Sequence, residues 1–258
     1  MYDLNKISRS LNTNIIGRSI IQYDSLDSTL TKAKNIFASC PDGTIILAED
    51  QSESLRPAGE WFCSPDKNIY LSIILKSVTE NYLLPLMDLV GCSSVLKSVE
   101  DLYGLDCRIK WPNDILINEK VFSSVKSDLG GKGSGIILSL NINVNMDEEM
   151  SDIKISSIKS EKDEDVEREI LIGAILSKIE NHYKEIINTG KVSNAVDICN
   201  KSLVYTNKEI GVTKRGRKTT RKVVAKNIDC DGRLIVINEK GEEEALSPGD
   251  AIIQYEEA

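Results

Sequence analysis

The stretch from Arg108 to Lys126 reads Arg-Ile-Lys-Trp-Pro-Asn-Asp-Ile-Leu-Ile-Asn-Glu-Lys-Val-Phe-Ser-Ser-Val-Lys. Its centre brings a cation, a large aromatic ring, an amide and a carboxylate into one bend. Pro112 fixes its own φ and pushes Trp111 towards extended geometry. Asn113 and Asp114 suit a turn, because their short side chains can bond nearby backbone groups. The stretch therefore predicts a rigid polar bend that leads into a strand.

A β-hairpin is predicted directly after this bend. The apolar runs 115–117 and 120–122 flank Asn118-Glu119, which we interpret as a tight two-residue turn. Lys120 then stands at the start of the return strand, within reach of the bend. These residues alone allow two interpretations: an exposed hairpin with solvated Asn, Asp and Lys side chains, or a site where the same side chains meet a ligand.

The segment Lys110 to Asp114, followed by a hairpin and Lys120, resembles the signature of the biotin protein ligases. These enzymes activate biotin with ATP and attach it to a lysine of a carboxylase's carrier domain. Five further segments resemble that family in the same order along the chain: Asp27-Ser28-Thr29, Ala48 to Gln51, Ser64-Pro65, Asn68 to Ser72, and Ile142 to Asn145. The residues from 206 onward resemble the family's small C-terminal barrel, so the resemblance covers nearly the whole chain.

The resemblance implies a role for each residue of a ligase site. The implied catalytic residues are Lys120, Asp114 and Lys110, with Lys120 as the cation beside the joined carboxylate and phosphate. The implied biotin contacts are Ser28, Thr29, Gln51 and Lys120. The implied ATP contacts are Arg56, Trp111, Asn113 and Asn143, where Trp111 either offers a flat surface to adenine or packs the bend. Asp114 and Asn143 are implied ligands of Mg²⁺, which prefers a few protein oxygens together with substrate phosphates.

The nucleotide loop departs from the family pattern Gly-Arg-Gly-Arg-x-Gly-Arg-x-Trp. The matching stretch here, Ser54 to Phe62, reads Ser-Leu-Arg-Pro-Ala-Gly-Glu-Trp-Phe. Without a gap, Phe62 takes the tryptophan place and Glu60 an arginine place; with a shift of one residue, Trp61 is the tryptophan and Arg56 a family arginine. A loop with a glutamate and a proline here is expected to hold a polyanion more weakly.

Further departures fall around the expected biotin pocket. Leu30 stands where the family has asparagine, and Phe122-Ser123-Ser124 stands where it has Ala-Gly-Ile or Gly-Gly-Ile. Ser139 and Asn141 replace two glycines, which in the family let a ligand approach the backbone closely. Side chains at these places are expected to narrow the trough for the ring and tail of biotin.

Composition excludes several other classes of protein. The chain has 258 residues and a net charge of −8, so it lacks the basic excess that nucleic-acid binding requires. Its six cysteines form no Cys-x-x-Cys pair and its one histidine, His182, is read as a surface or packing residue, which makes a zinc cluster improbable. With no signal-peptide stretch and no apolar run of membrane length, we expect a cytoplasmic protein that binds neither nucleic acid nor membrane.

The expected fold class is α/β (α+β): a mixed β-sheet with flanking helices, placed on one face, and then a small SH3-like β-barrel. The expected domains are residues 1–205, catalytic, and 206–258, the barrel. Periodicity and turn signals predict helices at 3–11, 28–38, 83–103, 166–188 and 195–203. They predict strands at 19–24, 44–49, 69–78, 107–110 and 135–145, then at 210–212, 223–225, 234–237 and 251–253. Residues 147–165 are expected to form an acidic link.

Three hypotheses for function follow. The first is an ATP- and Mg²⁺-dependent ligase that forms biotinyl-5'-AMP and transfers biotin to a biotin carboxyl carrier domain of a carboxylase; a homodimer is compatible with it. The second is a catalytically degenerate homologue that acts as a binding or regulatory module. The third is a related ligase for another small carboxylate, such as lipoate or a fatty acid. The basic run Lys214 to Lys218 is either a solvated loop tip or an electrostatic contact to an acidic carrier or to phosphate.

Overall fold

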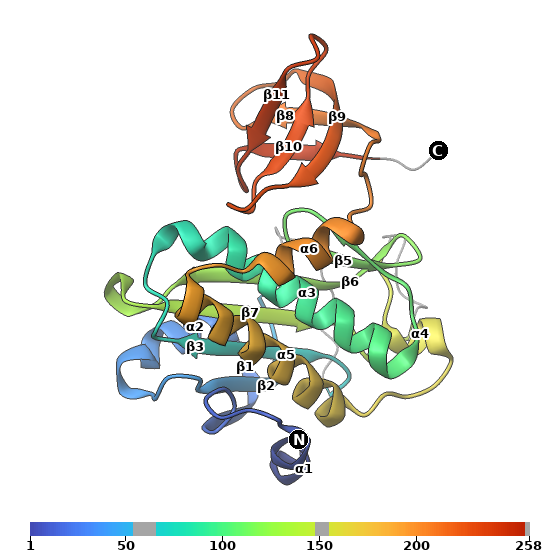
Figure 1. Ribbon diagram of the computed structural model, residues 1–258. Coiled ribbons are helices and arrows are strands. Elements are labelled where there is room, and N and C mark those ends of the chain that lie inside the picture. Colours follow the sequence, from blue (N-terminus) through green and yellow to red (C-terminus); the bar gives the residue numbers. More distant parts are fainter. Residues whose placement is uncertain (54–65, 148–154, 256–258) are drawn as a thin grey trace.

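The computed structural model describes residues 1–53, 66–147 and 155–255 and contains two β-sheets (Figure 1). The first sheet has seven strands in the order β1-β2-β3-β7-β6-β5-β4. Only β1 and β2 pair in parallel; the other neighbours are antiparallel, so the sheet is mixed, as predicted. Its strands are β1 Ile20–Leu26, β2 Ile45–Gln51, β3 Ile69–Leu75, β4 Cys107–Lys110, β5 Asp114–Ile117, β6 Lys120–Leu129 and β7 Ile136–Ile142.

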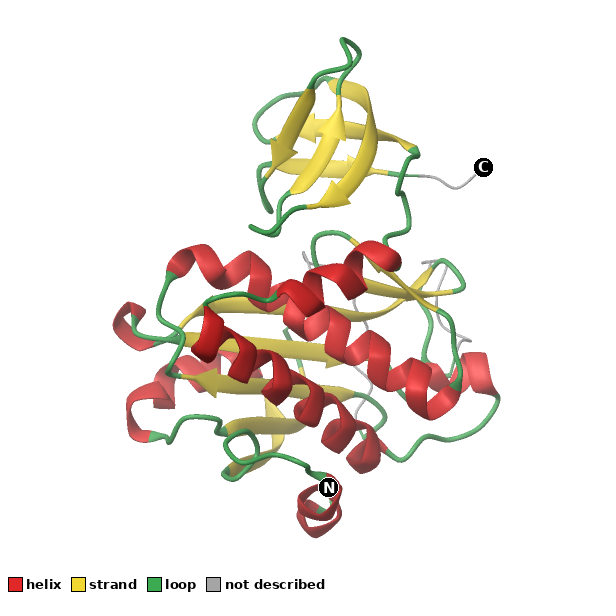
Figure 2. Cartoon of the chain, viewed as in Figure 1, coloured by secondary structure: helices red, strands yellow, loops and turns green. Residues whose placement is uncertain are grey.

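One face of this sheet packs against long helices. Figure 1 shows α3, α5 and α6 in front of the sheet, and Figure 2 gives the same view by type of secondary structure. Contact between α3 and the sheet is close, because a Cβ at Gly91 would lie 2.5 Å from Val125 Cγ1. The helices associated with this side are α1 Leu4–Ser10, α3 Leu84–Tyr103, α5 Arg168–Thr189 and α6 Ser193–Lys201.

The expectation of helices on one face only is wrong. Helix α2, Thr29–Ile36, covers part of the opposite face, where Leu30 and Ala33 share a hydrophobic cluster with Ile46 and Ile74. The reason lies in the strands, since β3 is buried along its whole length and its side chains alternate between the two faces. Both faces of the sheet must therefore be covered by helices to keep these side chains away from water.

Helix α3 with the short turn before it corrects the expectation that no apolar run reaches membrane length. The helical stretch Asn81–Tyr103 has 23 residues and contains an 18-residue window with a mean hydropathy of 1.3, enough to cross a bilayer by length and composition. However, 72 % of that window is buried inside the protein. Its apolar character is explained by its packing between the sheet and the other helices.

The acidic link contains a helix that the sequence interpretation missed. Helix α4, Ile158–Lys162, begins with a capping box in which Ser157 and Ser160 bond each other's backbone N–H groups. The serines were read as a link because the helix is only five residues long and mostly polar. Three 3₁₀ turns complete the elements of this part of the chain: Phe37–Ser39, Asn81–Leu83 and Gly131–Gly133.

The second sheet has five antiparallel strands in the order β11-β10-β9-β8-β12. The strands are β8 Glu209–Lys214, β9 Thr220–Ile228, β10 Leu234–Ile237, β11 Glu243–Leu246 and β12 Ala251–Gln254. Four of them were predicted; β11 was missed because its sequence Glu-Glu-Ala-Leu is mostly charged. Among the described residues β11 and β12 are the two edges of this sheet, which is not closed by pairing between them.

Candidate functional site

One row of side chains crosses the whole first sheet. Successive in-register pairs join its members across all seven strands, and in-register partners place their side chains on the same face. Two predicted site residues, Lys110 and Asp114, form one end of this row. Its members in spatial order are Tyr23, Ala48, Tyr70, Asn141, Ser124, Asp114 and Lys110. We call these seven residues the transverse row.

The transverse row lies on the face that α2 partly covers. Ile46 and Ile74 pack under α2. Ile46 lies two residues from Ala48 on β2, and Ile74 lies four residues from Tyr70 on β3, so each isoleucine points to the same face as its row residue. The neighbouring row on this face contains Ser72, Ser139 and the exposed Lys126. The face therefore changes from apolar under α2 to polar where the strands leave the helix.

The bend at Asn113 and Asp114 is fastened to strand β6. Ser124 donates its hydroxyl proton to Asp114 Oδ1. The Asn113 side-chain amide donates to the Val125 carbonyl, and Val125 N donates to the Asn113 carbonyl at 2.9 Å. The hairpin turn is also confirmed, since Asn118 and Glu119 both have positive φ, at 47° and 63°. Local turn chemistry and β6 together hold the Asp114 carboxylate in the row.

Trp111 packs the bend against the second sheet. Its side chain is 2 % exposed, and its indole nitrogen donates to the Gly232 carbonyl at 3.0 Å. Tyr205 donates its hydroxyl proton to the Trp111 carbonyl at 2.9 Å. Burial, and after it the negative charge of Asp114, raise the pKa of Tyr205, so the phenol keeps the proton that it donates. Of the two predicted roles for Trp111, this geometry supports packing, and the adenine contact stays a prediction.

The predicted biotin contacts Thr29 and Gln51 meet in a buried network. Gln51 Oε1 accepts from the Thr29 backbone N–H at 2.8 Å and from the Thr29 hydroxyl at 3.0 Å. Ser72 donates to Thr29 Oγ1 at 2.9 Å and lies 2.7 Å from Ser139 Oγ. Gln51 Nε2 donates to the Glu53 carbonyl at 2.7 Å and to Asn141 Oδ1 at 3.4 Å. We call Thr29, Gln51, Ser72, Ser139 and Asn141 the hydroxyl–amide network.

Ser28 lies at the edge of this network. Its hydroxyl accepts from Thr31 N at 3.3 Å and caps helix α2. A hydroxyl that accepts the cap bond keeps its own proton for a second partner. Ser28 can therefore both start the helix and donate to a ligand.

Lys120 and Asn143 are not part of the transverse row. Lys120 pairs with Ile117, three residues along β5 from Asp114, which corresponds to about 10 Å of strand. Asn143 is fully buried; its Oδ1 accepts from Asn68 Nδ2 and its Nδ2 donates to the Ser156 carbonyl, each at 3.1 Å. Asn143 lies two strands away from Asp114 across the sheet and two residues beyond Asn141 along the chain, which corresponds to roughly 12 Å. The two residues therefore do not fit one shared Mg²⁺ ion here, and a Mg²⁺ contact stays a proposal for Asp114 alone.

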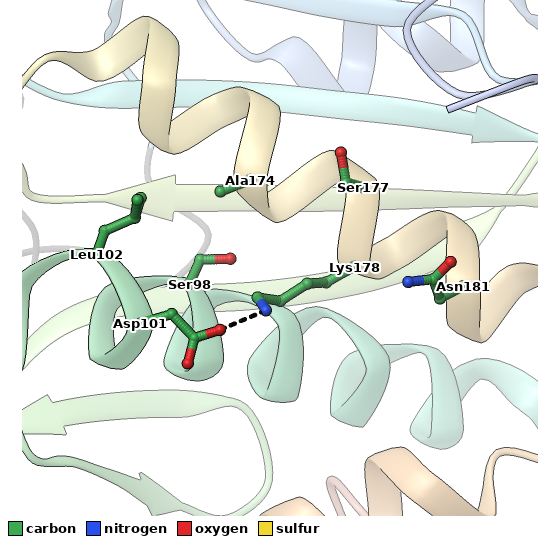
Figure 3. Close-up of a pocket in the computed structure, with 7 residues that line it drawn as sticks. All are labelled: Ser98, Asp101, Leu102, Ala174, Ser177, Lys178 and Asn181. Atoms are coloured by element: carbon green, nitrogen blue, oxygen red, sulfur yellow. Dashed lines mark hydrogen bonds and ion pairs between the residues drawn. The ribbon is translucent and has the colours of Figure 1, made fainter. Parts of the chain in front are cut away.

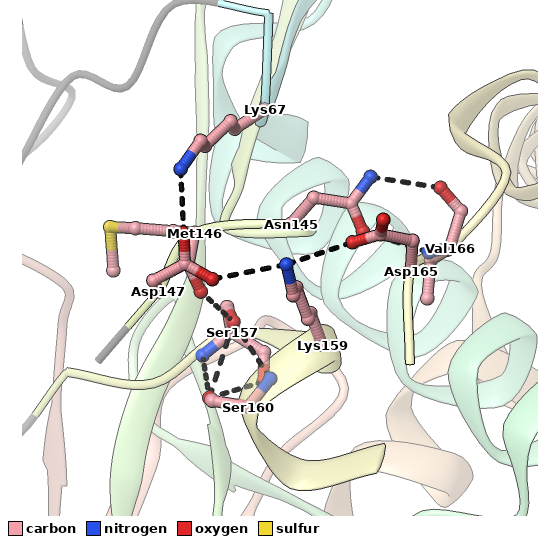
Figure 4. A network of polar contacts seen from close by, with 9 residues as sticks. All are labelled: Lys67, Asn145, Met146, Asp147, Ser157, Lys159, Ser160, Asp165 and Val166. Atoms are coloured by element: carbon pink, nitrogen blue, oxygen red, sulfur yellow. Dashed lines mark hydrogen bonds and ion pairs between the residues drawn. The ribbon is translucent and has the colours of Figure 1, made fainter. Parts of the chain in front are cut away.

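An exposed ionic network lies beyond Asn143, after the end of β7 (Figure 4). Lys159 contacts Asp147 at 3.0 Å and Asp165 at 2.9 Å, and Lys67 contacts Asp147 at 2.7 Å. Beside them, Asn145 exchanges two hydrogen bonds with the backbone of Val166. These contacts fix where the chain enters α4 and α5.

Several sequence-derived candidates lie apart from the site or outside the described residues. Arg56 and the loop Ser54 to Phe62 are outside the described residues. Leu30 and Phe122 belong to two separate hydrophobic clusters, whereas Ser139 and Asn141 stand on the polar face. His182 is a buried packing residue of α5, 3.4 Å from Ser93 Oγ, and burial lowers its pKa. Among the described residues no group of three His, Cys, Asp or Glu side chains could hold a metal.

The sequence interpretation did not name Tyr70 and Ser72 as site residues, and it named Ser124 only as a departure beside the expected biotin pocket. A signal was present for two of them, because Tyr70 and Ser72 are the polar positions of an otherwise apolar strand and have its period of two. A separate pocket of about 330 Å³ lies between α3 and α5, where Asp101 and Lys178 form an ion pair at 2.7 Å (Figure 3). It contains none of the predicted site residues.

Comparison with known proteins gives consistent results. The model of the biotin/lipoate A/B protein ligase family matches residues 22–147. The bifunctional ligase/repressor BirA of Bacillus subtilis is 27 % identical over 195 residues, which cover 72 % of this chain and 60 % of that protein. Biotin–protein ligase 2 of Arabidopsis thaliana is 23 % identical over 198 residues, covering 73 % of this chain and 60 % of that protein. The chain thus spans about three fifths of these relatives.

Solved structures share the fold. The biotin protein ligase from Aquifex aeolicus in complex with biotin and ATP superposes with a TM-score of 0.79 at 22 % identity, covering 93 % of this chain and all of that one. The biotin protein ligase from Leishmania major in complex with biotinyl-5-AMP superposes with a TM-score of 0.58 at 19 % identity, covering 89 % of this chain and 99 % of that one.

Proposed function

We propose, from the membership of residues 22–147 in the biotin/lipoate A/B protein ligase family, that this protein is a biotin–[biotin carboxyl carrier protein] ligase. It activates biotin with ATP as biotinyl-5'-AMP and transfers the biotinyl group to a lysine of a carrier domain. The observation that carries the proposal is the transverse row, which places Lys110 and Asp114 on the same sheet face as the hydroxyl–amide network. A polar head group and a reacting carboxylate can then bind along one surface.

The first step joins two anions. A carboxylate oxygen of biotin attacks the α-phosphorus of ATP, the bond to the bridging oxygen breaks, and pyrophosphate leaves. Positive charge held near the reacting oxygens lowers this barrier. Lys110 stands at the end of the row on the partly exposed edge strand, and Lys120 opens the adjacent return strand. Mg²⁺, when bound with the nucleotide, neutralises phosphate charge, and Asp114 is the residue of the row that can contact it.

The second step transfers the biotinyl group to the carrier. The lysine amine attacks the carbonyl carbon of the mixed anhydride, and AMP leaves with the electron pair of the broken C–O bond. Thr29, Gln51 and Ser28 hold the head group during both steps, because their hydroxyl and amide groups lie at the polar end of the face. Arg56, Asn113 and Asn143 complete the proposal as nucleotide contacts.

Wider parts of the proposal concern the whole chain. We assign residues 1–205 to the catalytic domain and 206–258 to an SH3-like barrel, of which the five-stranded second sheet is the described part. The carrier partner, a homodimer and a cytoplasmic location belong to the same proposal.

A ligase for a different small carboxylate is the second candidate. Ser139 and Asn141 add polar side chains to the polar face, at two positions where glycines would let a ligand approach the backbone closely. A degenerate homologue without activity is the alternative from another class. Calorimetry with biotin, alone and with ATP and Mg²⁺, separates these: heat with biotin supports the ligase, and heat with lipoate alone supports the second candidate.

Lys120→Ala tests the chemistry directly. If Lys120 neutralises the junction of carboxylate and phosphate, pyrophosphate release falls about 100- to 1,000-fold. Lys222→Ala is the matched control, because Lys222 lies in β9 with 75 % of its side chain exposed and is remote from the row. Equal release by wild type and Lys120→Ala would remove Lys120 from the catalytic residues. Absence of biotin binding by wild type would instead favour the degenerate homologue.

A further inference from the structure

Asn141 carries a buried donor that has no acceptor among the described residues. The residue is 1 % exposed in the middle of the transverse row, between Tyr70 and Ser124. Its Oδ1 accepts from Gln51, but in the part of the chain that the structure describes its Nδ2 has no hydrogen-bond partner. Buried amide donors are almost always paired, because an unpaired one loses its bonds to water and gains nothing in return. This donor therefore points to an acceptor that a bound ligand can supply.

The orientation of the Asn141 amide follows from its neighbours. Gln51 Oε1 must be the oxygen, because it receives the backbone N–H of Thr29, which can only donate. Gln51 Nε2 is then the donor to the Glu53 carbonyl and to Asn141. The atom of Asn141 that faces Gln51 must accept, so it is the oxygen. The NH₂ group consequently points away from Gln51.

The other donors of the hydroxyl–amide network all have acceptors inside the protein. The Thr29 hydroxyl gives its proton to Gln51, and Ser72 gives its proton to Thr29. Since the Ser72 proton is used, Ser139 is the donor in the contact of 2.7 Å between these two serines. Each hydroxyl proton thus has an acceptor, and within this network only the Asn141 NH₂ group remains to donate.

We propose that Asn141 is a specificity-determining residue whose side-chain NH₂ donates a hydrogen bond to the carbonyl oxygen of the substrate's cyclic urea ring. The inference rests on the proposed function, because it takes biotin as the substrate. A neutral acceptor fits better than the substrate's carboxylate, since the hydroxyl–amide network contains no cation and a buried anion without one is costly. Lys110 and Lys120 lie elsewhere and suit the carboxylate.

The test combines one substitution with one change in the ligand. Asn141→Asp keeps the oxygen that accepts from Gln51 and replaces only the donor, by an anionic acceptor. The ligand 2-iminobiotin replaces the ring carbonyl oxygen by a protonated nitrogen, which donates and cannot accept. Asn181→Asp is the matched control, because it makes the same exchange at an exposed asparagine of α5, in the pocket between α3 and α5 that contains none of the predicted site residues.

Calorimetric titration of full-length protein gives the readout. Wild type is expected to bind biotin at least about tenfold more tightly than 2-iminobiotin, a comparison that needs no variant. Asn141→Asp is expected to weaken biotin about tenfold to a hundredfold and to reverse the preference in favour of 2-iminobiotin. Asn181→Asp is expected to bind biotin within about threefold of wild type.

Three results would overturn the inference. Equal biotin affinity for wild type and a folded Asn141→Asp would mean that the Asn141 donor meets no ligand, while the ligase assignment would stand. Equal affinity of wild type for biotin and 2-iminobiotin would have the same meaning, even if the variant does not fold. Binding of lipoate or octanoate without any binding of biotin would overturn both the inference and the proposed function, because neither ligand has a ring oxygen.

Discussion

The hydroxyl–amide network and the ionic network of Lys67, Asp147, Lys159 and Asp165 do the same structural task in different surroundings. Each ties together segments that are far apart in the sequence. The first is neutral and no member is more than 1 % exposed. The second is charged and its side chains are 33 % to 76 % exposed. In water the partners of a broken contact find new ones, so burial and not charge decides how much each contact stabilises the fold.

Gln51→Leu removes contacts of the buried hydroxyl–amide network and should have the largest effect on stability. It leaves the Thr29 N–H and hydroxyl without their acceptor, so we expect the free energy of unfolding to fall by about 2–4 kcal/mol. Chemical denaturation measures this loss. Ser52→Ala is the control next in the chain, because its hydroxyl bonds an exposed Asp27 and should cost less than about 0.5 kcal/mol. Similar losses for both variants would contradict the comparison.

Glu180 sharpens the comparison because it is both charged and buried. Its carboxylate is 1 % exposed, contacts Lys184 at 2.7 Å and accepts from the backbone N–H groups of Asn14, Ile15 and Ile16. Burial alone would raise its pKa, but Lys184 and the three N–H groups lower the pKa to about 2. Ionised Glu180 therefore stabilises the native state.

The sign of the pH dependence follows from that lowered pKa. The stabilising contribution is complete above the ordinary pKa of 4.5 and is lost as the pH falls towards about 2. Glu180→Gln should reduce the free energy of unfolding by on the order of 2 kcal/mol at pH 7 and flatten its decline below pH 4.5. Denaturation curves at pH 7, 4 and 3 measure both. A variant that loses stability with acid as steeply as wild type would refute the role of Glu180.

Lys159→Ala removes two ion pairs of the exposed ionic network and should have the smallest effect on stability. Both of its ion pairs are open to solvent, so the expected loss is below about 1 kcal/mol. Salt screens exposed charges, and the difference from wild type should shrink further in about 1 M salt. Thermal unfolding at low and high salt tests this. A loss as large as that of Gln51→Leu would show that the exposed network has a larger role than its solvent exposure allows.

The bend and its hairpin show how far local sequence reaches. Pro112, Asn113 and the Asn118-Glu119 turn act through their own backbone preferences, so their conformations were predictable. The distance between Lys120 and the bend was less predictable. The register places Lys120 three residue pairs from Asp114 along the strand, and its role beside the bend stays a prediction. A β-bulge between Ile115 and Leu116 shifts that register, and no residue in the sequence predicts this bulge.

The candidate site was predicted in part. Thr29 and Gln51 were named separately and proved to be bonded to each other. Asn113 and Trp111 were named as nucleotide contacts, with packing of the bend as the alternative for Trp111. In the structure their side chains fasten the bend to β6 and to the second sheet, and the nucleotide contacts stay predictions. Both residues lie in the motif that carried the resemblance, which shows that a motif residue can serve the frame of a site.

The sequence by itself determined the order of helices and strands apart from α4 and β11, the polar bend and the family resemblance, because these depend on periodicity and on residues close together in the chain. Only the tertiary structure decided which side chains form the transverse row, since register between residues as distant in the sequence as Tyr70 and Asn141 is set by the packing of the whole sheet. It also decided that Asn141 ends as a buried donor without an acceptor among the described residues, because hydrogen-bond satisfaction is a property of neighbours that meet only when the sheet has formed.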